Sequence, residues 1–375
     1  MGRSFFSDLS RRERWLEPDE REVRLAELIR KLADDDIVVP ESCRRRFSDT
    51  SVAVIGGGLA GLSAALELAS KGAIATVFEA RPRVGGRVLS RTDVARGRIV
   101  EYGAELIGAI HPLWHRYAQQ YKLGCIGRTD AELHMKAGLE SRLELDRRLT
   151  YEEQAKLAND LERRVFRPIG LLANKIADPA RPWRQPALKA FDSMSVGGLL
   201  TKTLGIARGS RLFLAMEQLL VNNNVAPLDE LNLLGLMCLV KGGQFTARDK
   251  RLLGYWNELE IFRASDGCEE LAREMAKELV TRWRGKVRTK TAVTKIDLAK
   301  RPELTWNEID ERCRTLRTGS AGFDFVVFAV PPTVWPHVKI TPVHPMDPGQ
   351  VGIMNTGPAV KHFSVLRRRV PSPGV

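Results

Sequence analysis

The chain has 375 residues, of which 43% are hydrophobic and 28% are charged, and this balance excludes a disordered or a fibrous protein. The length predicts about two domains. Lys and Arg (59) outnumber Asp and Glu (46), for a formal net charge of +13. No basic run is interleaved with aromatic residues, so we expect the charge to be solvated surface and no nucleic-acid partner.

No segment has the character of a signal peptide or a membrane span. The first 20 residues alternate charged and single apolar residues, and the most apolar run, Leu231–Val240, is far shorter than the roughly 20 residues that cross a bilayer. The five cysteines form no CxxC pair, which indicates reduced thiols. We therefore expect a soluble, cytoplasmic protein without a membrane partner.

The N-terminal half begins with a helical extension and continues into a βαβ unit. Residues 1–48 form the predicted extension, with an amphipathic helix over 18–34. The apolar run Val52–Ile55 has the character of a strand buried on both faces, and a Gly-rich turn, a helix and a second strand over 74–78 follow it.

Residues 111–258 are predicted to be mostly helical and to form a substrate domain together with 333–375. Thr150 and Glu153 have capping-box spacing, and the helix that they start is expected to end before Pro168. Two further helices are predicted over 208–222 and 229–241.

The α/β pattern returns at about residue 261. Asp266 and Glu269 again have capping-box spacing, and strands are predicted over 291–298 and 323–330, the second of them as a central strand of the sheet. The expected fold class is therefore α/β, with a Rossmann-like dinucleotide-binding domain over 49–110 and 259–332 and the helical domain inserted into it.

The Gly-rich turn carries the first chemical motif. Gly56, Gly58 and Gly61 have GxGxxG spacing between a strand and a helix, where a pyrophosphate can meet bare backbone at the positive end of the helix dipole. Glu79 ends the second strand, where its carboxylate can accept hydrogen bonds from ribose hydroxyls. The alternative is a Gly-rich turn with an unrelated surface carboxylate.

A second motif decides which dinucleotide is expected. Residues 79–87 read EARPRVGGR, in which two adjacent glycines offer a second stretch of bare backbone and Arg87 offers a fork of donors to phosphate. Because the nicotinamide fingerprint has no such second element, we expect FAD. No cysteine lies in a recognisable flavin-attachment motif, so the FAD is expected to be non-covalent.

The string VAVIGGGLAGLSAALELASKGAIATVFEARPRVGGRV resembles the N-terminal signature of the flavin-containing amine oxidase family. VEYGAELIG at 100–108, FRASDGCEEL at 262–271, TAVTKIDL at 291–298 and FDFVVFAVPP at 323–332 match further motifs in the same order. The resemblance implies FAD contacts from Gly56, Gly58, Gly61, Glu79, Arg81, Gly86, Arg87, Gly103, Ala104, Glu105, Leu106 and the backbone of Val293.

The resemblance also implies a catalytic lysine. GPAVKHFSVL at 357–366 is similar to the family strand that carries a lysine near the flavin N5 atom, and it places Lys361 at that position. Such a lysine assists the reaction of reduced flavin with oxygen. The alternative is a surface lysine on an edge strand.

The sequence departs from the family after Lys361. It ends at Val375, without the family's C-terminal Gly-rich segment and without the aromatic pair that follows the lysine. A fragment, a shortened product, or completion of the site by a second copy or another subunit all remain open.

The implied reaction is oxidation of an amine or an L-amino acid to an imine, with O2 reduced to H2O2. Glu105 and Leu106 stand where amino acid oxidases carry a carboxylate-binding arginine, which favours an amine, although Arg248 or Arg263 could serve instead. The histidines (His111, His115 and His134) have no metal-ligand spacing, so no metal site is expected. A related FAD-dependent desaturase or porphyrinogen oxidase, and a non-catalytic FAD-binding subunit, are the alternatives.

Overall fold

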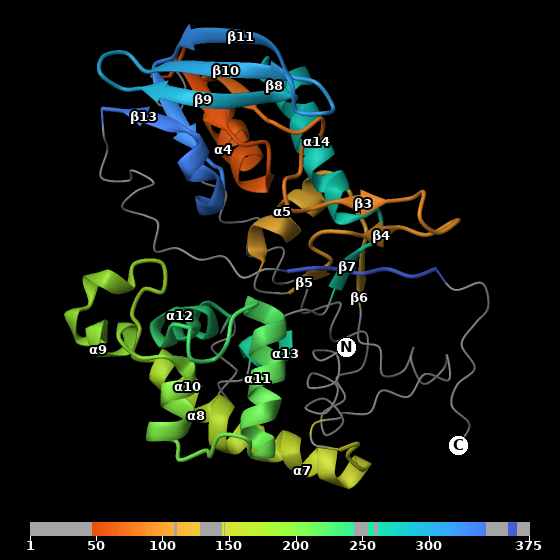
Figure 1. Cartoon of the computed structure of the whole chain (residues 1–375), viewed down its shortest axis with the longest axis vertical. Helices are drawn as coiled ribbons and strands as arrows, with labels where there is room; N and C mark the ends of the chain where they lie inside the picture. The colour runs from red at the N-terminus through yellow and green to blue at the C-terminus, as the bar shows by residue number, and fades with distance from the viewer. Residues whose placement is uncertain are drawn as a thin grey trace.

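The computed structural model describes residues 47–108, 111–127, 145, 147–243, 254–258, 262–342 and 359–365. The helix predicted over 18–34 lies outside these residues. Figure 1 shows an α/β part at the top of the view and a helical part at the bottom. The polypeptide passes from the first part to the second and back, as the sequence pattern predicts.

Four parallel strands form the sheet that carries the first Gly-rich turn. Across the sheet they are β12 (Phe325–Phe328), β1 (Ser51–Ile55), β2 (Ile74–Phe78) and β8 (Lys286–Arg288). The prediction that 323–330 forms a central strand is wrong for the described residues, because β12 lies at the edge and Phe325 is 59% exposed. An apolar run shows that both faces of a strand are covered, but it does not show whether both edges are paired.

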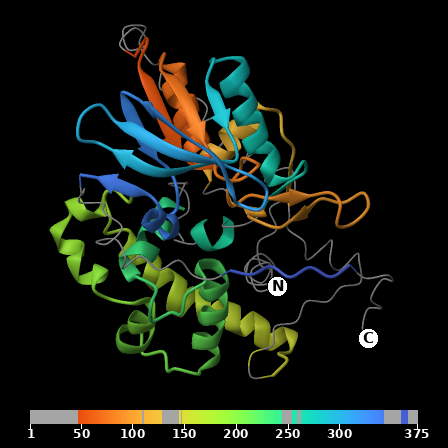
Figure 2. The same ribbon diagram turned by 45° about the horizontal axis from the view of Figure 1, so that its top comes forward.

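The parallel sheet lies between two helices and a second sheet (Figures 1 and 2). Val52 and Val54 pack against α4 (Leu59–Ser70) and α14 (Cys268–Thr281), whereas Ala53 and Ile55 pack against the second sheet. This division follows from the alternation of side chains along a strand. The second sheet has the order β11 (Thr315–Gly322), β10 (Glu303–Ile309), β9 (Thr291–Asp297) and β13 (Lys339–Thr341).

Smaller elements extend the α/β part toward the helical part. They are β3 (Ser90–Arg91), β4 (Val100–Glu101), β5 (Leu106–Ile107), α5 (Pro112–Gln120), β6 (Cys125–Gly127) and β7 (Phe262–Ala264). The Tyr117 hydroxyl of α5 lies 3.0 Å from the Ser63 hydroxyl of α4, and the Tyr121 hydroxyl donates to Glu278 of α14 at 2.6 Å. The sequence predicts residues 111–127 as part of the substrate domain, but in the structure they pack on the α/β part. The same holds for β13, which pairs with β9.

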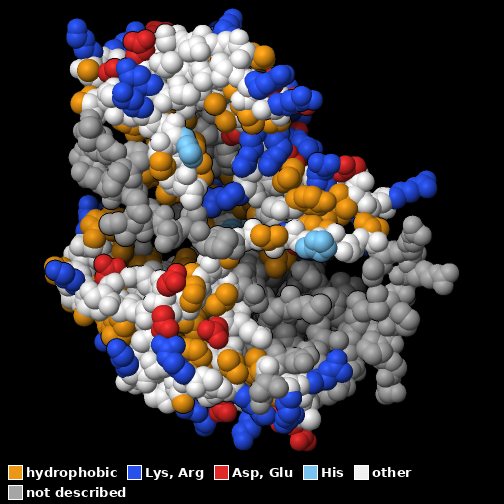
Figure 3. All heavy atoms as spheres, in the orientation of Figure 1, with side chains coloured by type: hydrophobic (Ala, Val, Ile, Leu, Met, Phe, Trp, Pro, Cys, Tyr) orange, Lys and Arg blue, Asp and Glu red, His pale blue; other side chains and the backbone are white. Residues whose placement is uncertain are grey.

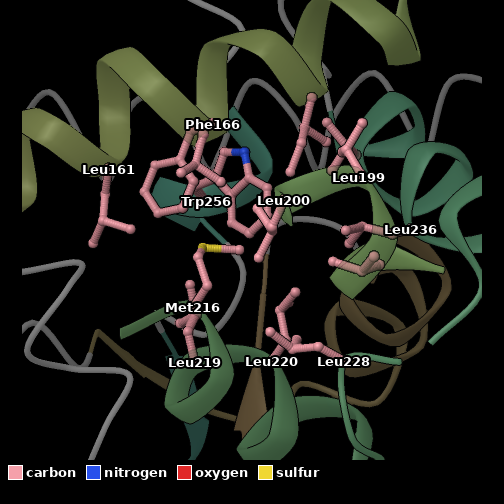
Figure 4. Packing of buried hydrophobic residues seen from close by; sticks show 14 of the residues in the cluster. Leu161, Phe166, Leu199, Leu200, Met216, Leu219, Leu220, Leu228, Leu236 and Trp256 are labelled. Atoms are coloured by element: carbon pink, nitrogen blue, oxygen red, sulfur yellow. The ribbon is translucent and has the colours of Figure 1, made fainter. Parts of the chain in front are cut away.

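The helical part has a hydrophobic core of its own (Figure 4). In that core the Phe166 ring stacks on the Trp256 ring with 4.3 Å between the centroids. The helices are α7 (Tyr151–Leu161), α8 (Arg167–Ala173), α9 (Lys189–Asp192), α10 (Val196–Gly198), α11 (Arg211–Asn224), α12 (Leu233–Gly242) and α13 (Gly254–Glu258). Helices α11 and α12 correspond to the two predicted over 208–222 and 229–241.

The capping box of Thr150 and Glu153 is confirmed at the start of α7. The predicted end of that helix before Pro168 is wrong, because a π-helical turn, Glu162–Phe166, joins α7 directly to α8. Pro168 is the second residue of α8 and directly follows the π-helical turn, so the wider turn lies where a proline removes an intrahelical hydrogen bond. A widened helical turn therefore accommodates the proline.

Charge is dispersed over one face of the molecule (Figure 3). On the face drawn in Figure 3, Lys and Arg side chains lie over both parts of the molecule, with Asp and Glu side chains among them. Over the described ranges, no helix combines the length and the apolar character that a membrane span needs.

Candidate cofactor site

The first Gly-rich turn brings α4 unusually close to β1. Gly56 has a φ of +106°, a conformation that side-chain-bearing residues rarely adopt. A Cβ added to Gly61 would lie 1.9 Å from the Gly56 carbonyl oxygen. Both positions therefore require glycine, and the amino end of α4 points at bare backbone, where a phosphate can bind.

The second Gly-rich turn packs directly on the first. The Gly85 N–H donates to the Gly57 carbonyl at 2.8 Å, and Gly58 and Gly85 form an isolated parallel bridge. A Cβ on Gly86 would lie 3.2 Å from the Gly58 Cα. Two motifs predicted separately from the sequence thus form one backbone surface without side chains.

Glu79 lies at the end of β2, beside this surface, and is 8% exposed. Its Oε2 accepts from the Gly57 N–H and its Oε1 accepts from the Arg81 N–H, both at 2.8 Å. An ionised carboxylate has about four acceptor positions, so Glu79 can still accept a hydrogen bond from a ribose hydroxyl. The Thr291 N–H donates to the Glu79 backbone carbonyl at 2.9 Å, which joins the start of β9 to the end of β2, and Val293 of β9 is buried.

Three arginines of the second motif have different surroundings. Arg81 donates to the Gly86 carbonyl at 3.0 Å, and the Arg87 residue is exposed. Sequence analysis missed Arg83, whose guanidinium donates to the carbonyls of Val84, Gly86 and Val88 at 2.8 to 3.0 Å. Burial lowers the pKa of Arg83. Arg83 therefore holds the second turn in shape, and the motif alone gave no signal that separates it from its neighbours.

The segment Gly103–Leu106 continues the surface beyond the second motif. A Cβ on Gly103 would lie 2.0 Å from the Arg87 carbonyl oxygen, and the Ala104 N–H donates to the same oxygen at 3.0 Å. Leu106 then pairs with Arg263 across β5 and β7. The structure thus aligns the predicted FAD-contacting residues in one continuous series.

Two buried carboxylates, Glu101 and Glu269, hold the backbone beside these residues through hydrogen bonds. The sequence alone did not point to this role. Glu101 is 5% exposed and accepts from the Cys268 N–H at 2.7 Å and from the Ser90 hydroxyl at 2.8 Å. Glu269 is 3% exposed and accepts from the Ser90 N–H at 3.0 Å. A carboxylate at the amino end of α14 is also favoured by the helix dipole.

The capping box predicted for Asp266 and Glu269 is wrong. The N-cap of α14 is Gly267, which has a φ of +87° and no side chain. The Asp266 carboxylate instead accepts from the Gly124 N–H at 2.9 Å. Glu101 and Ser90, both far away in sequence, satisfy the first N–H groups of the helix.

Lys361 lies against the Gly103–Leu106 segment. Its Nζ donates to the Glu101 carbonyl at 3.2 Å and forms an ion pair with Glu105 Oε2, also at 3.2 Å. Two residues later, the Phe363 ring stacks on Tyr102 with 5.0 Å between the centroids. The lysine side chain is 38% exposed, but its ammonium group is bound to the surface that the flavin ring is predicted to follow.

Two of the histidines singled out in the sequence, His111 and His115, lie within the described residues. His115 is 2% exposed with Nε2 3.0 Å from the Gly108 carbonyl oxygen, and burial lowers the pKa of both His115 and His111. Burial raises the pKa of the Cys268 thiol to about 12. The part of the chain that the structure describes contains no group of three or more metal-ligating side chains; His134 and Arg248 lie outside it.

The α/β part thus brings together two apposed glycine turns, a strand-end carboxylate and a lysine bound to the Gly103–Leu106 segment. The chain belongs to the flavin containing amine oxidoreductase family, whose family profile matches residues 59–370. The family uses a flavin, and the backbone surface described above has the bare, amide-rich character that such a cofactor requires.

Individual relatives agree with this assignment. A flavin-containing amine oxidase from Danio rerio is 28% identical over 286 residues, which cover 75% of this chain and 50% of that protein. An L-amino-acid oxidase from Bungarus fasciatus is 35% identical over 109 residues, 28% of this chain and 21% of that protein. The chain therefore spans about half the length of the first of these relatives.

Solved structures show the same fold. Putrescine oxidase bound to putrescine superposes with a TM-score of 0.57 at 20% identity, covering 78% of this chain and 60% of that one. Cyclohexylamine oxidase from Brevibacterium oxydans gives a TM-score of 0.56 at 19% identity, covering 80% of this chain and 62% of that one. The shared architecture is an α/β fold with a parallel sheet.

Proposed function

We propose that the protein binds FAD non-covalently in a Rossmann-like site and oxidises a primary or secondary amine, or an L-amino acid, to an imine. O2 is the electron acceptor and H2O2 the second product. The observation that carries the proposal is the position of Lys361, because its Nζ binds both the Glu101 carbonyl and the Glu105 side chain.

Different residues of the site would contact different parts of FAD. The backbone of the two glycine turns and the Arg81 and Arg87 side chains would hold the pyrophosphate, and Glu79 would accept from the ribose. Gly103, Ala104 and Leu106 would lie along the flavin ring, and Val293 would meet the adenine through its backbone. When bound, the flavin supplies the acceptor for a hydride and returns the electrons to oxygen.

Lys361 would act on the oxygen side of the reaction. An ammonium group fixed beside the flavin stabilises negative charge that develops as electrons pass to O2, and it can hold a water there. Burial raises the pKa of the Cys268 thiol to about 12, which disfavours the nucleophilic thiolate and agrees with a non-covalent flavin.

The surroundings of Arg263 favour an amine without a carboxylate. Its guanidinium lies 2.5 Å from Glu105 Oε1, so a substrate carboxylate would have to compete with a carboxylate of the protein. L-amino acids remain in the proposal, since Arg248 lies outside the described residues. A cytoplasmic location is part of the proposal and rests on the sequence alone.

Two measurements test the proposal. The FAD-loaded protein is first mixed anaerobically with putrescine, cyclohexylamine or L-leucine, and bleaching of the flavin absorbance by at least one of them is the expected result. The flavin is then reduced chemically and mixed with O2, and we expect Lys361→Met to slow reoxidation at least about tenfold, a loss of about 1.4 kcal/mol of transition-state stabilisation. Lys277→Met is the control, because Lys277 pairs with Glu274 on the exposed face of α14.

Each alternative has its own outcome. Reduction by a carbon–carbon donor and by none of the amines would favour a desaturase or porphyrinogen oxidase. FAD binding without reduction by any donor would favour a non-catalytic subunit. An unchanged reoxidation rate in Lys361→Met would return Lys361 to the role of a surface lysine.

A further inference from the structure

We propose that Glu105 is a positioning residue for Lys361, and that Arg263 controls how firmly Glu105 holds the lysine. The role of Lys361 in the reaction rests on the proposed function, but the pairing itself does not. The proposal assigns Glu105 a task toward a protein side chain, in addition to its expected place along the flavin.

The geometry puts one carboxylate between two cations. Glu105 Oε2 lies 3.2 Å from Lys361 Nζ, and Oε1 lies 2.5 Å from Arg263 Nη2. The Glu105 side chain is 24% exposed, and each cation is 38% exposed. Each carboxylate oxygen therefore serves a different cation, in partial contact with water.

The secondary structure fixes this arrangement. Glu105 immediately precedes β5, and the next residue, Leu106, is the cross-strand partner of Arg263 on β7. The Cys268 thiol lies 3.7 Å from the Glu105 carbonyl, so the start of α14 packs behind the same residue. Two backbone elements thus hold Glu105 in place, whereas Lys361 comes from a segment far away in the chain.

The neighbouring carboxylate cannot replace Glu105. Glu101 offers Lys361 its backbone carbonyl, but its side chain is buried and accepts from the Cys268 N–H and the Ser90 hydroxyl. Among the residues that the structure describes, Glu105 is the carboxylate paired with Lys361. The position of the ammonium group therefore depends on Glu105.

Sharing one carboxylate makes the two cations competitors. Removing the charge of Glu105 leaves Lys361 and Arg263 as like charges that repel one another, so the ammonium group is held in place less firmly. Removing Arg263 has the opposite effect, because the full charge of Glu105 is then available to Lys361. A residue that only supported the local fold would loosen Lys361 in both variants.

Competitive labelling of the FAD-free chain tests the pairing. Wild type and variant are acetylated with light and heavy reagent at one fixed pH, and the rate at Lys361 is read by peptide mass spectrometry. Glu105→Gln should raise the rate about two- to fivefold, the range expected for a partly exposed ion pair. Arg263→Gln should lower it, and Arg263→Lys should restore it toward the wild-type value.

The rate at Lys277, which pairs with Glu274 on α14, is the internal control and should stay constant in every variant. An unchanged Lys361 rate in Glu105→Gln, or a rise in both Glu105→Gln and Arg263→Gln, would overturn the proposal. Because no flavin takes part, failure here differs from failure of the proposed function, which the reoxidation rates of Lys361→Met report.

Discussion

At the glycine-turn end of the site the contacts join residues that are close in sequence, whereas at the Lys361 end they join residues that are far apart. Glu79 binds Gly57 across 22 positions, but the Lys361 pair with Glu105 spans 256 positions. The first end is made of backbone that only glycine allows, and the second of charged side chains from several elements. A short motif can therefore specify the first end, but only the whole fold can assemble the second.

The largest expected effect is at the glycine-turn end. Gly61→Ala should destabilise the protein by about 3 kcal/mol and abolish FAD binding, because the new methyl would meet the Gly56 carbonyl and force α4 away from β1. Urea denaturation measures the change. Gly242→Ala is the matched control, since a Cβ there meets nothing within 4 Å, and it should stabilise the protein by roughly 0.5 to 1 kcal/mol. Similar unfolding free energies for the two variants would show that the contact between residue 61 and the Gly56 carbonyl does not exclude a side chain.

The next effect concerns Glu79. Glu79→Ala should weaken FAD binding by about 1 to 3 kcal/mol, because the ribose loses a charged acceptor and the Gly57 and Arg81 N–H groups lose theirs. Titration of the folded protein with FAD gives the affinity. Glu67→Ala, which removes an exposed partner of Lys71, should leave it unchanged. Equal affinities of wild type and Glu79→Ala would take Glu79 out of the site.

The smallest expected effect is a loss of stability at low pH that begins at the Lys361 end of the site. Burial holds the pKa of His115 below its usual 6.5, so its stabilising contribution is present above about pH 6.5 and is lost as the pH falls through the lowered pKa. His115 binds the Gly108 carbonyl and packs edge-on against Phe262, next to Arg263. Acid should therefore loosen the Lys361 end first.

We expect the unfolding free energy to fall between pH 7.5 and 5.5 through this group, and His115→Phe to reduce that dependence. Hydrogen exchange locates the change. The amides of β5 should lose protection at pH 5.5 before those of β1. Simultaneous loss in both strands would show that the two ends respond as one unit.

The sequence predicts the parts of the fold that local pattern controls. The continuous apolar run of β1, the spacing of the glycines and the capping box of Thr150 each depend on neighbouring residues, and each agrees with the structure. The predictions that were wrong depend on contacts between residues that are far apart in the chain. Whether β12 has one neighbour or two, and whether Asp266 caps α14, are decided by residues elsewhere in the chain.

The same division holds for the candidate site. The first glycine turn and Glu79 follow from the motif itself, and resemblance to the family added Lys361. Neither pointed to Arg83 as the residue that holds the second turn, nor to Glu101 and Ser90 as caps of α14. A buried carboxylate that caps a distant helix has no signature in its own neighbourhood, because its donors become neighbours only after folding.

The central claim is that the paired glycine turns and Glu79 bind the nucleotide half of FAD. Calorimetric titration of the wild-type chain with FAD and with FMN tests it most directly, because FMN has the flavin but lacks the adenosine and one phosphate. We expect one FAD per chain, much weaker or no binding of FMN, and release of intact FAD on denaturation. Equal affinity for FMN and FAD, or a folded chain that binds neither, would contradict it.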